Sequence, residues 1–251
     1  MTRFCAKQHC DFVVMLGDNF YPSGVDSVSD PQWQTVFEEP FKDLSVPFYV
    51  ALGNHDYGDD GSGKDIARAQ TQVQYTAHSK KWKMPANRYH VPLGTVELFA
   101  TDTNIAYWGD DTAMRDDLKG WLAASKAPWK IAFGHHPYLS NGPHRDAGNN
   151  EAVAGRGVKL KRFFEDVVCG KADVYLAGHD HSLQWLKPTC QGTELFVSGS
   201  GQSFSSVKND HPAHFQKSGL GFIYFEADAQ TLTARFVDEN GDVMFSRSIN
   251  K

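Results

Sequence analysis

Short runs of apolar residues recur along the 251-residue chain, and their spacing predicts an α/β fold. Each run holds about five residues and is rich in valine, phenylalanine and leucine, which is typical of strands covered on both faces. Between several runs lie segments whose apolar residues repeat at helical spacing. We therefore expect strands at residues 12–16, 46–52, 96–100, 129–133, 173–177 and 194–198, and helices at residues 31–41, 66–79, 114–125 and 158–168.

The last part of the chain has a different pattern. Three apolar runs at residues 221–227, 231–237 and 243–249 follow one another closely. Asn240 and Gly241 between the last two runs favour a tight hairpin turn, so this part is predicted to be an antiparallel meander. No linker rich in proline, serine or glycine divides the chain. We expect a single domain over residues 1–251, built on two sheets.

Composition and charge exclude several classes of protein. The chain has 25 basic and 30 acidic residues, a net charge of −5 and no block rich in lysine or arginine. This balance argues against nucleic acid and anionic membranes as partners. The longest apolar runs are too short to span a bilayer. The 11 histidines point toward metal or proton chemistry, because imidazole is the commonest metal ligand.

The four cysteines are Cys5, Cys10, Cys169 and Cys190, and none of them forms a C-x-x-C pair. A structural zinc knuckle is therefore not expected. The cysteines would form two disulfides in an exported protein or remain thiols in a cytosolic one, and the sequence leaves both states open. Cys169 and Cys190 flank the strand expected at residues 173–177, and we predict that they are close enough to bridge.

Four short motifs each begin with a glycine directly after an expected strand. They are residues 17–21 (Gly-Asp-Asn-Phe-Tyr), 53–56 (Gly-Asn-His-Asp), 134–137 (Gly-His-His-Pro) and 178–181 (Gly-His-Asp-His). In an open α/β sheet the carboxyl ends of the strands converge on one crevice, where ligands bind. A glycine at the end of a strand lets the chain turn sharply and present the next side chain there. We expect the four motifs to form one site.

The side chains of the motifs are oxygen and imidazole donors without a thiolate, a mixture that suits iron, manganese or zinc. Each motif alone has an ordinary structural explanation: Asp-Asn and Asn-His-Asp are common in turns, and His-His-Pro fits a loop before proline. The two histidines of the last motif are a stronger signal, because alternate residues of an extended segment project to the same side. All four motifs together favour a metal site. Its candidate donors are Asp18, Tyr21, Asn54, His135, His179 and His181.

In this order the motifs resemble those of the metallophosphoesterases, and more narrowly those of the purple acid phosphatases of the tartrate-resistant type. Tyr21, three residues after Asp18, separates this type from other metallophosphoesterases. The likeness runs from about Cys10 to the C-terminus. It implies an α/β/β/α sandwich of two mixed sheets flanked by helices. It also implies an acid phosphatase acting on small phosphate monoesters. Members of this type are mostly exported, so a secreted or periplasmic location is expected.

The resemblance further implies a dinuclear metal centre and a role for each donor. Asp18 would bridge Fe(III) and a second ion, which would be Fe(II), Zn(II) or Mn(II). Tyr21 and His181 would bind Fe(III), while the remaining donors, Asn54, His135 and His179, would bind the second ion. A hydroxide activated by the two metals would attack the phosphate.

Three further residues receive roles beside the metals. His55 and His144 match the substrate histidines of the family, so they would contact phosphate, together with Asn54, and donate a proton to the leaving group. Asp56 is expected to support catalysis by orienting His55. His136 is expected to be a packed or supporting residue and not a ligand.

One departure from the family pattern concerns the N-terminal region. The family has a further motif, Gly-Asp-X-Gly, on a strand that precedes the first motif seen here, and its aspartate is a ligand of Fe(III). None of the 17 residues ahead of Asp18 carries this pattern, and Asp11 lies at the start of its strand instead of the end. We therefore expect a missing first strand, an unpaired strand edge and a weakened first metal site. Two alternatives remain open: an impaired, non-catalytic metal-binding remnant, or a phosphodiesterase or nucleotide hydrolase using the same site.

Overall fold

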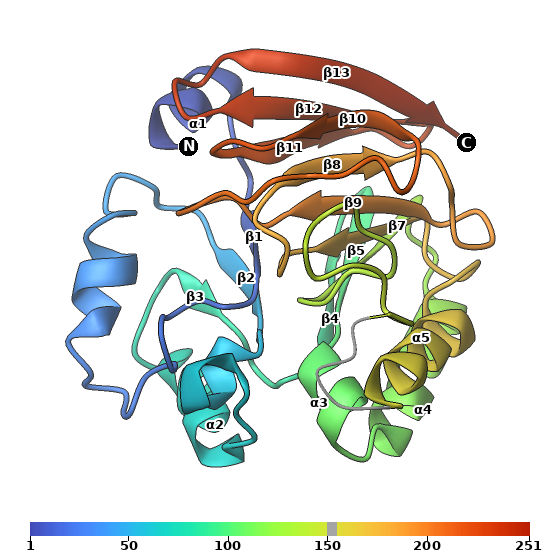
Figure 1. Cartoon of the computed structure of the whole chain (residues 1–251). Helices are drawn as coiled ribbons and strands as arrows, with labels where there is room; N and C mark the ends of the chain where they lie inside the picture. Colours follow the sequence, from blue (N-terminus) through green and yellow to red (C-terminus); the bar gives the residue numbers. More distant parts are fainter. Residues whose placement is uncertain (150–154) are drawn as a thin grey trace.

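The strands predicted from the apolar runs are present in the computed structural model, which describes residues 1–149 and 155–251 (Figure 1). The largest sheet has seven strands, and four neighbouring strands in it run parallel. Its members, in spatial order, are β10 (Ala213–Lys217), β8 (Leu183–Leu186), β9 (Glu194–Ser198), β7 (Val174–Ala177), β6 (Trp129–Phe133), β5 (Val96–Ala100) and β4 (Tyr89–Leu93).

The remaining strands form two further sheets. The first is parallel and consists of β1 (Val13–Leu16), β2 (Phe48–Ala51) and β3 (Trp82–Lys83). The second is the predicted antiparallel meander of β11 (Gly221–Ala227), β12 (Thr231–Asp238) and β13 (Val243–Asn250). The expectation of two sheets is corrected to three, because no described strand pairs β1 with β11.

The helices are α1 (Thr2–Gln8), α2 (Ile66–Tyr75), α3 (Thr103–Trp108), α4 (Thr112–Ala124) and α5 (Arg156–Val167). The helix expected at residues 31–41 is a single π-helical segment, Trp33–Glu38, bounded by Pro31 and Pro40. A proline lacks the amide that a helix interior needs, so this segment stays short. Short 3₁₀ turns follow at His55–Tyr57 and Asp59–Gly61. In the described part of the chain, no helix has the length and apolar character needed to cross a membrane.

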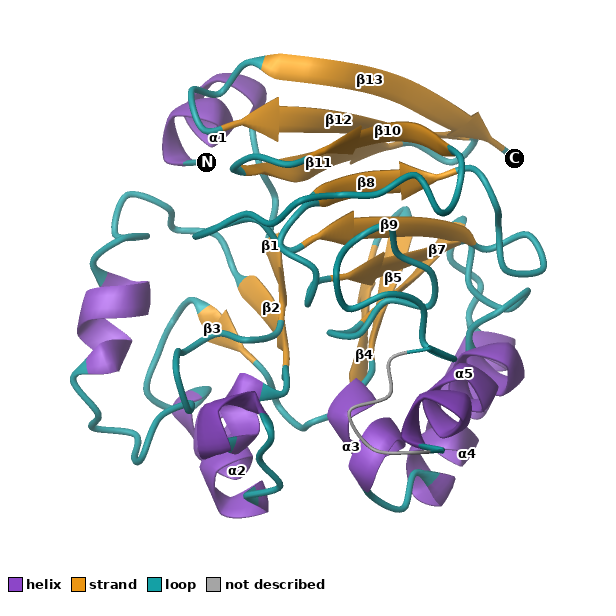
Figure 2. Ribbon diagram, viewed as in Figure 1, coloured by secondary structure: helices purple, strands orange, loops and turns teal. Residues whose placement is uncertain are grey.

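Two apolar clusters give the molecule its layers. One lies between the sheets and includes Phe48 of β2, Phe133 of β6 and Phe236 of β12. The other joins the opposite face of the seven-stranded sheet to the helices and includes Phe99 of β5 and Phe163 of α5. Figure 2 shows α3, α4 and α5 below the seven-stranded sheet and α2 beside the β1–β3 sheet. The layers are therefore helix, sheet, sheet and helix, as predicted for a metallophosphoesterase fold.

Both possible local disulfides are formed. Cys169 and Cys190 have Cα atoms 5.0 Å apart and are bridged, which confirms the prediction for this pair. Cys5 and Cys10 bridge the end of α1 to the segment that enters β1. The Cys169–Cys190 bond ties the end of α5 to the β8–β9 connection, so it closes a loop across a sequence separation of 21 residues.

Replacing both Cys169 and Cys190 by alanine is expected to lower the free energy of unfolding by about 3 kcal/mol, because the unfolded chain gains the freedom of that loop. Urea denaturation of the oxidised protein measures the change. The matched variant replaces Cys5 and Cys10, which close a loop of only five residues and should cost less. A larger loss in the Cys5 and Cys10 variant would contradict the loop-length argument.

Candidate metal centre

The four motifs meet at the carboxyl ends of β1, β2, β6 and β7. These strands belong to two different sheets, which bring their carboxyl ends together. Asp18, His135 and His179 each offer one ligand atom, and the three atoms lie within 4.8 Å of one another. Asp18 and His179 have positive φ angles of 53° and 63°. Such a backbone costs about 1–3 kcal/mol per residue and persists where the surrounding structure imposes it, as at binding sites.

His135 shows how the site is prepared for a cation. Its Nδ1 lies 2.8 Å from the carbonyl oxygen of Leu16, which only accepts, so Nδ1 carries the proton and donates it. Nε2 of the neutral ring then presents a lone pair, the form that binds metal. Three other polar atoms lie within 3.2 Å of this nitrogen. They are Asn54 Oδ1 at 2.9 Å, His179 Nδ1 at 3.0 Å and Asp18 Oδ2 at 3.2 Å.

The neighbours of Asn54 and Asp18 fix the remaining donor atoms. The Asn54 amide nitrogen donates to the carbonyl oxygen of Gly61 at 2.8 Å, so the amide oxygen faces the cluster. The backbone amide of His55 donates to Asp18 Oδ1 at 2.9 Å, which leaves Oδ2 toward His135. More electron-pair donors therefore converge here than there are protons to satisfy them. A bound metal ion resolves that excess, so the residues fit one.

Tyr21 and His181 lie on the other side of Asp18. The Tyr21 hydroxyl donates to Asp18 Oδ2 at 2.9 Å and lies 3.1 Å from His181 Nε2. Asp18 Oδ2 therefore lies between the two groups of donors and contacts both. Ser203 contacts the other ring nitrogen of His181 at 2.8 Å. Ser203 lies in a loop outside the four motifs, so no motif in the sequence pointed to it.

Burial and neighbouring charges shift the pKa values of these groups. Burial raises the pKa of the Asp18 carboxyl, but the interactions with His135 and with the backbone amide and ring of His55 together outweigh burial and hold that pKa well below its usual range. Burial and the neighbouring histidines lower the pKa of His179. Burial and the Asp18 carboxylate raise the pKa of the Tyr21 phenol. The protein alone thus keeps Asp18 ionised, His179 neutral and Tyr21 protonated.

His55 and His144 lie beside the two groups of donors. The ring of His55 is 4.4 Å from the ring of Tyr21, and its Nδ1 is 2.6 Å from the carbonyl oxygen of Pro22. The ring of His144 is 4.1 Å from the ring of His179. His144 is exposed and His55 is half-buried. Both are therefore reachable by a small molecule that enters the cluster.

Asp180 positions the loop that carries His144. Its Oδ1 accepts the backbone amide of His144 at 2.9 Å, and Oδ2 accepts the hydroxyl of Ser140. The Asp180 side chain is fully buried. Asp180 lies between His179 and His181 in the last motif, but it was not among the predicted site residues. Nothing local in the sequence indicates that it reaches a loop about 40 residues earlier.

Asp56 does not occupy the position expected of it. It is fully buried and accepts hydrogen bonds from the backbone amides of Gly53 at 2.8 Å and Asn19 at 3.0 Å, and from the Gln72 side chain at 2.7 Å. Burial and the Asp18 carboxylate raise its pKa to about 6. The expected contact that orients His55 is thus replaced by hydrogen bonds that join the first two motif loops.

His136 is buried and packs against neighbouring side chains, as expected. Its Nδ1 lies 2.8 Å from the Thr103 hydroxyl, and its ring stacks on Tyr107 with centroids 5.8 Å apart. Burial lowers its pKa well below the usual value. These contacts place a neutral imidazole behind the donors, where it supports His179, whose ring centroid is 4.6 Å away.

Gly53 shows how closely the first two motif loops approach. A Cβ atom at this position would lie 2.2 Å from the backbone nitrogen and from Oδ1 of Asp18. The Gly53→Ala variant is therefore expected to displace Asp18 and to lower metal affinity at least about tenfold. Metal content after dialysis measures the change. Gly120→Ala is the matched control, since a Cβ there meets nothing within 4 Å, and normal metal content in Gly53→Ala would contradict the packing argument.

Residues 1–183 match the family model described as calcineurin-like phosphoesterase. Tartrate-resistant acid phosphatase type 5 of Rattus norvegicus is 29% identical over 279 residues, covering 95% of this chain and 78% of that protein. Purple acid phosphatase 17 of Arabidopsis thaliana is 30% identical over 270 residues, covering 98% of this chain and 73% of that protein.

Two solved structures share the fold across nearly the whole chain. One is described as GAP50, the anchor in the inner membrane complex of Plasmodium, with a TM-score of 0.77, 22% identity, and coverage of 99% of this chain and 81% of that one. The other is the purple acid phosphatase PPD1 from yellow lupin (Lupinus luteus) seeds, with a TM-score of 0.72, 22% identity, and coverage of 99% and 48%. At this level of identity the likeness establishes the fold.

Proposed function

The chain belongs to the calcineurin-like phosphoesterase family as a metal-dependent phosphoesterase of the purple acid phosphatase type, and from this premise we propose that it hydrolyses small phosphate monoesters at a metal centre held by its motif residues. The observation that carries the proposal is the convergence of three polar atoms within 3.2 Å of the lone pair on His135 Nε2.

We assign the donors to two groups that share Asp18. The first group consists of Asp18, Tyr21 and His181. The second group consists of Asp18, Asn54, His135 and His179. We propose Fe(III) for the first group and Fe(II), Zn(II) or Mn(II) for the second, in keeping with oxygen and imidazole donors. When bound, the metals supply positive charge that acidifies water and neutralises a phosphate.

The chain's own residues provide the remaining functions. His135 is held by the Leu16 carbonyl so that its lone pair faces the cluster, and Asn54 is held by Gly61 so that its oxygen does. Asp56 keeps the two loops that carry Asp18 and Asn54 in register through the amides of Asn19 and Gly53.

His55 and His144 are proposed to bind phosphate oxygens and to give a proton to the leaving alkoxide. Their positions support this role, because they lie next to Tyr21 and His179 and are accessible to solvent. A positioned general acid contributes about 10²- to 10⁴-fold to the rate. Protonated imidazole is the form that would donate, so this role fits an acidic working pH.

Two disulfides support a location in an oxidising compartment, which for this chain is a secreted or periplasmic setting. The same bonds would be reduced in most cytosolic environments.

The test compares p-nitrophenyl phosphate, a monoester, with bis(p-nitrophenyl) phosphate, a diester, on the metal-loaded chain. We expect faster turnover of the monoester, loss of activity with a chelator and recovery when metal is returned. Preference for the diester would identify a phosphodiesterase instead. Metal binding without turnover of either compound would favour a non-catalytic metal-binding protein.

A further inference from the structure

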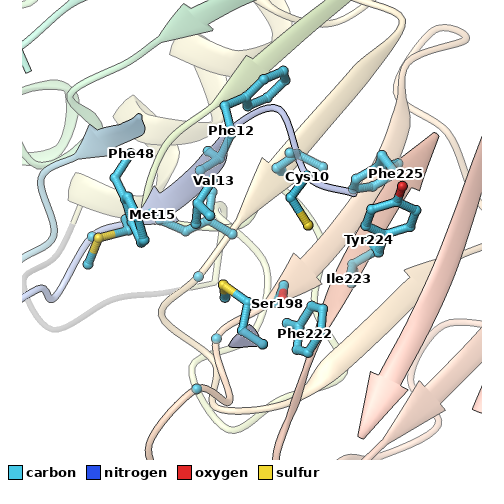
Figure 3. Close-up of a pocket in the computed structure, with 18 of the residues that line it drawn as sticks. Cys10, Phe12, Val13, Met15, Phe48, Ser198, Phe222, Ile223, Tyr224 and Phe225 are labelled. Atoms are coloured by element: carbon cyan, nitrogen blue, oxygen red, sulfur yellow. The ribbon is translucent and has the colours of Figure 1, made fainter. Parts of the chain in front are cut away.

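The donors of the metal centre come from two sheets, so their spacing depends on how those sheets are held together. Asn54 follows β2 and His135 follows β6, yet Asn54 Oδ1 and His135 Nε2 are only 2.9 Å apart. Beside β1, a cavity of about 1140 Å³ interrupts the packing, and Figure 3 shows Val13, Met15 and Phe222 around it. The alignment of the two loops must therefore come from contacts elsewhere.

Asp102 makes such a contact two residues after the end of β5. It is fully buried, and its Oδ2 accepts the hydroxyl of Tyr57, which lies in the 3₁₀ turn directly after Asn54. The same oxygen accepts the Asn87 side chain at 3.2 Å. Burial and the Asp102 carboxylate raise the pKa of the Tyr57 phenol, so the hydroxyl keeps its proton and donates it. This hydrogen bond joins the Asn54 loop to the seven-stranded sheet.

Thr103, the next residue, holds the loop that carries His135. Its hydroxyl oxygen accepts the backbone amides of His135 at 3.3 Å and His136 at 3.0 Å. Because both lone pairs are then used, the hydroxyl hydrogen points to His136 Nδ1, 2.8 Å away. Thr103 is fully buried, and a Cβ atom on Gly134 would lie 3.0 Å from its methyl carbon. The His135 loop therefore packs directly on this side chain.

We propose that Asp102 and Thr103 are positioning residues for the metal centre, and that together they set the spacing of the donors that come from the two sheets. The inference rests on the metal centre of the proposed function. Asp102 fixes the Asn54 loop through Tyr57, and Thr103 fixes the backbone at His135. Since the two residues are adjacent, they hold both loops at one separation. Metal–ligand distances vary by only about 0.2 Å, so a small shift of either loop should cost metal affinity.

A second tyrosine also joins the two sheets, at a place farther from the donors. The hydroxyl of Tyr89 on β4 accepts the backbone amide of Val50 at 2.8 Å and lies 2.9 Å from the Val50 carbonyl oxygen. Val50 lies inside β2, four residues before Asn54. This contact keeps the sheets docked when the Tyr57 hydroxyl is removed. Loss of the Tyr57 hydroxyl should therefore move the Asn54 loop and leave the sheets in place.

The first test removes the Thr103 hydroxyl. Thr103→Val keeps the shape of the side chain without the hydroxyl, and Thr103→Ser keeps the hydroxyl. Thr101→Val is the matched control, because the buried Thr101 hydroxyl donates to the carbonyl oxygen of Phe133 within the sheet at 3.1 Å. Calorimetric titration of the chelator-treated chain with Zn²⁺ measures the Kd of the tight site. We expect Thr103→Val to raise the Kd about 10- to 100-fold, and Thr103→Ser and Thr101→Val to change it less than about threefold.

The second test removes the Tyr57 hydroxyl, and it stands independently should Thr103→Val fail to fold. Tyr57→Phe should raise the Kd for Zn²⁺ about tenfold, whereas Tyr89→Phe should lower the thermal midpoint and leave the Kd unchanged. Equal affinities in Thr103→Val and Thr101→Val, or equal losses in the two tyrosine variants, would overturn this inference and leave the metal centre standing. An unaltered chain that binds no Zn²⁺ would overturn the metal centre itself and this inference with it.

Discussion

Replacing His135 by alanine is expected to remove metal from the second group of donors and to lower phosphatase activity by more than about 100-fold. Losing a residue that only orients a metal ligand costs about 10- to 100-fold, and losing a ligand should cost more. The reason is geometric. The His135 lone pair is the point on which Asp18, Asn54 and His179 converge, so its loss opens the middle of the cluster. Metal content after dialysis and the rate on p-nitrophenyl phosphate measure the two effects.

Three histidine variants outside this group test whether the loss of metal is specific to His135. His78→Ala removes an exposed histidine after α2 and should change neither metal content nor rate. His55→Ala and His144→Ala should keep the metal and lower the rate by about 10²- to 10⁴-fold, because they are proposed to act on the substrate. Loss of metal in these two variants would show that the roles are assigned wrongly.

The 251-residue chain is also expected to bind about one metal ion tightly and a second one weakly. The second group has four donors, whereas the first has only Asp18, Tyr21 and His181, with Asp18 shared. Asp11, the nearest preceding carboxylate, lies before β1, at the end of the strand opposite to Asp18, and pairs with His9. A hard trivalent ion depends on anionic oxygen donors, so the first site should suffer most.

Metal titration of the chelator-treated chain, followed by elemental analysis, measures the stoichiometry. We expect about one equivalent to survive dialysis, with little of the colour that a tyrosinate–Fe(III) bond produces in this family. Burial and Asp18 already oppose ionisation of Tyr21, so the phenolate forms only where a strongly bound cation compensates. Two equivalents of equal affinity together with full colour would show that another residue completes the first site.

The sequence by itself was sufficient to predict the strands and the place of the site. The run Val174–Ala177 is continuous and apolar because both faces of β7 are covered, and that requirement is visible locally. Glycine-led motifs directly after four such strands predicted that Asp18, Asn54, His135 and His179 would meet. The structure brings Asp18, Asn54 and His179 within hydrogen-bonding distance of His135, because the parallel strands of each sheet end at one edge and the two sheets bring these edges together.

Short strands with mixed composition were not predicted. Strand β10, which contains His214 and Lys217, has no clear apolar alternation, and it is present because it pairs with β8. The pairing of a strand across a sheet supplies hydrogen bonds that outweigh a weak local preference. The same reason explains why the division into three sheets was not visible in the sequence.

The tertiary structure alone decided the contacts between residues far apart in the chain. Asp56 turns to Gln72 and the Asn19 amide instead of His55, and Asp180 reaches the His144 loop. A buried carboxylate needs hydrogen-bond donors to replace water, and the packing determines which donors lie beside it. The sequence therefore determined which residues arrive at the carboxyl ends of the strands, because strand ends are local features. Only the packing of the sheets determined what holds those residues there.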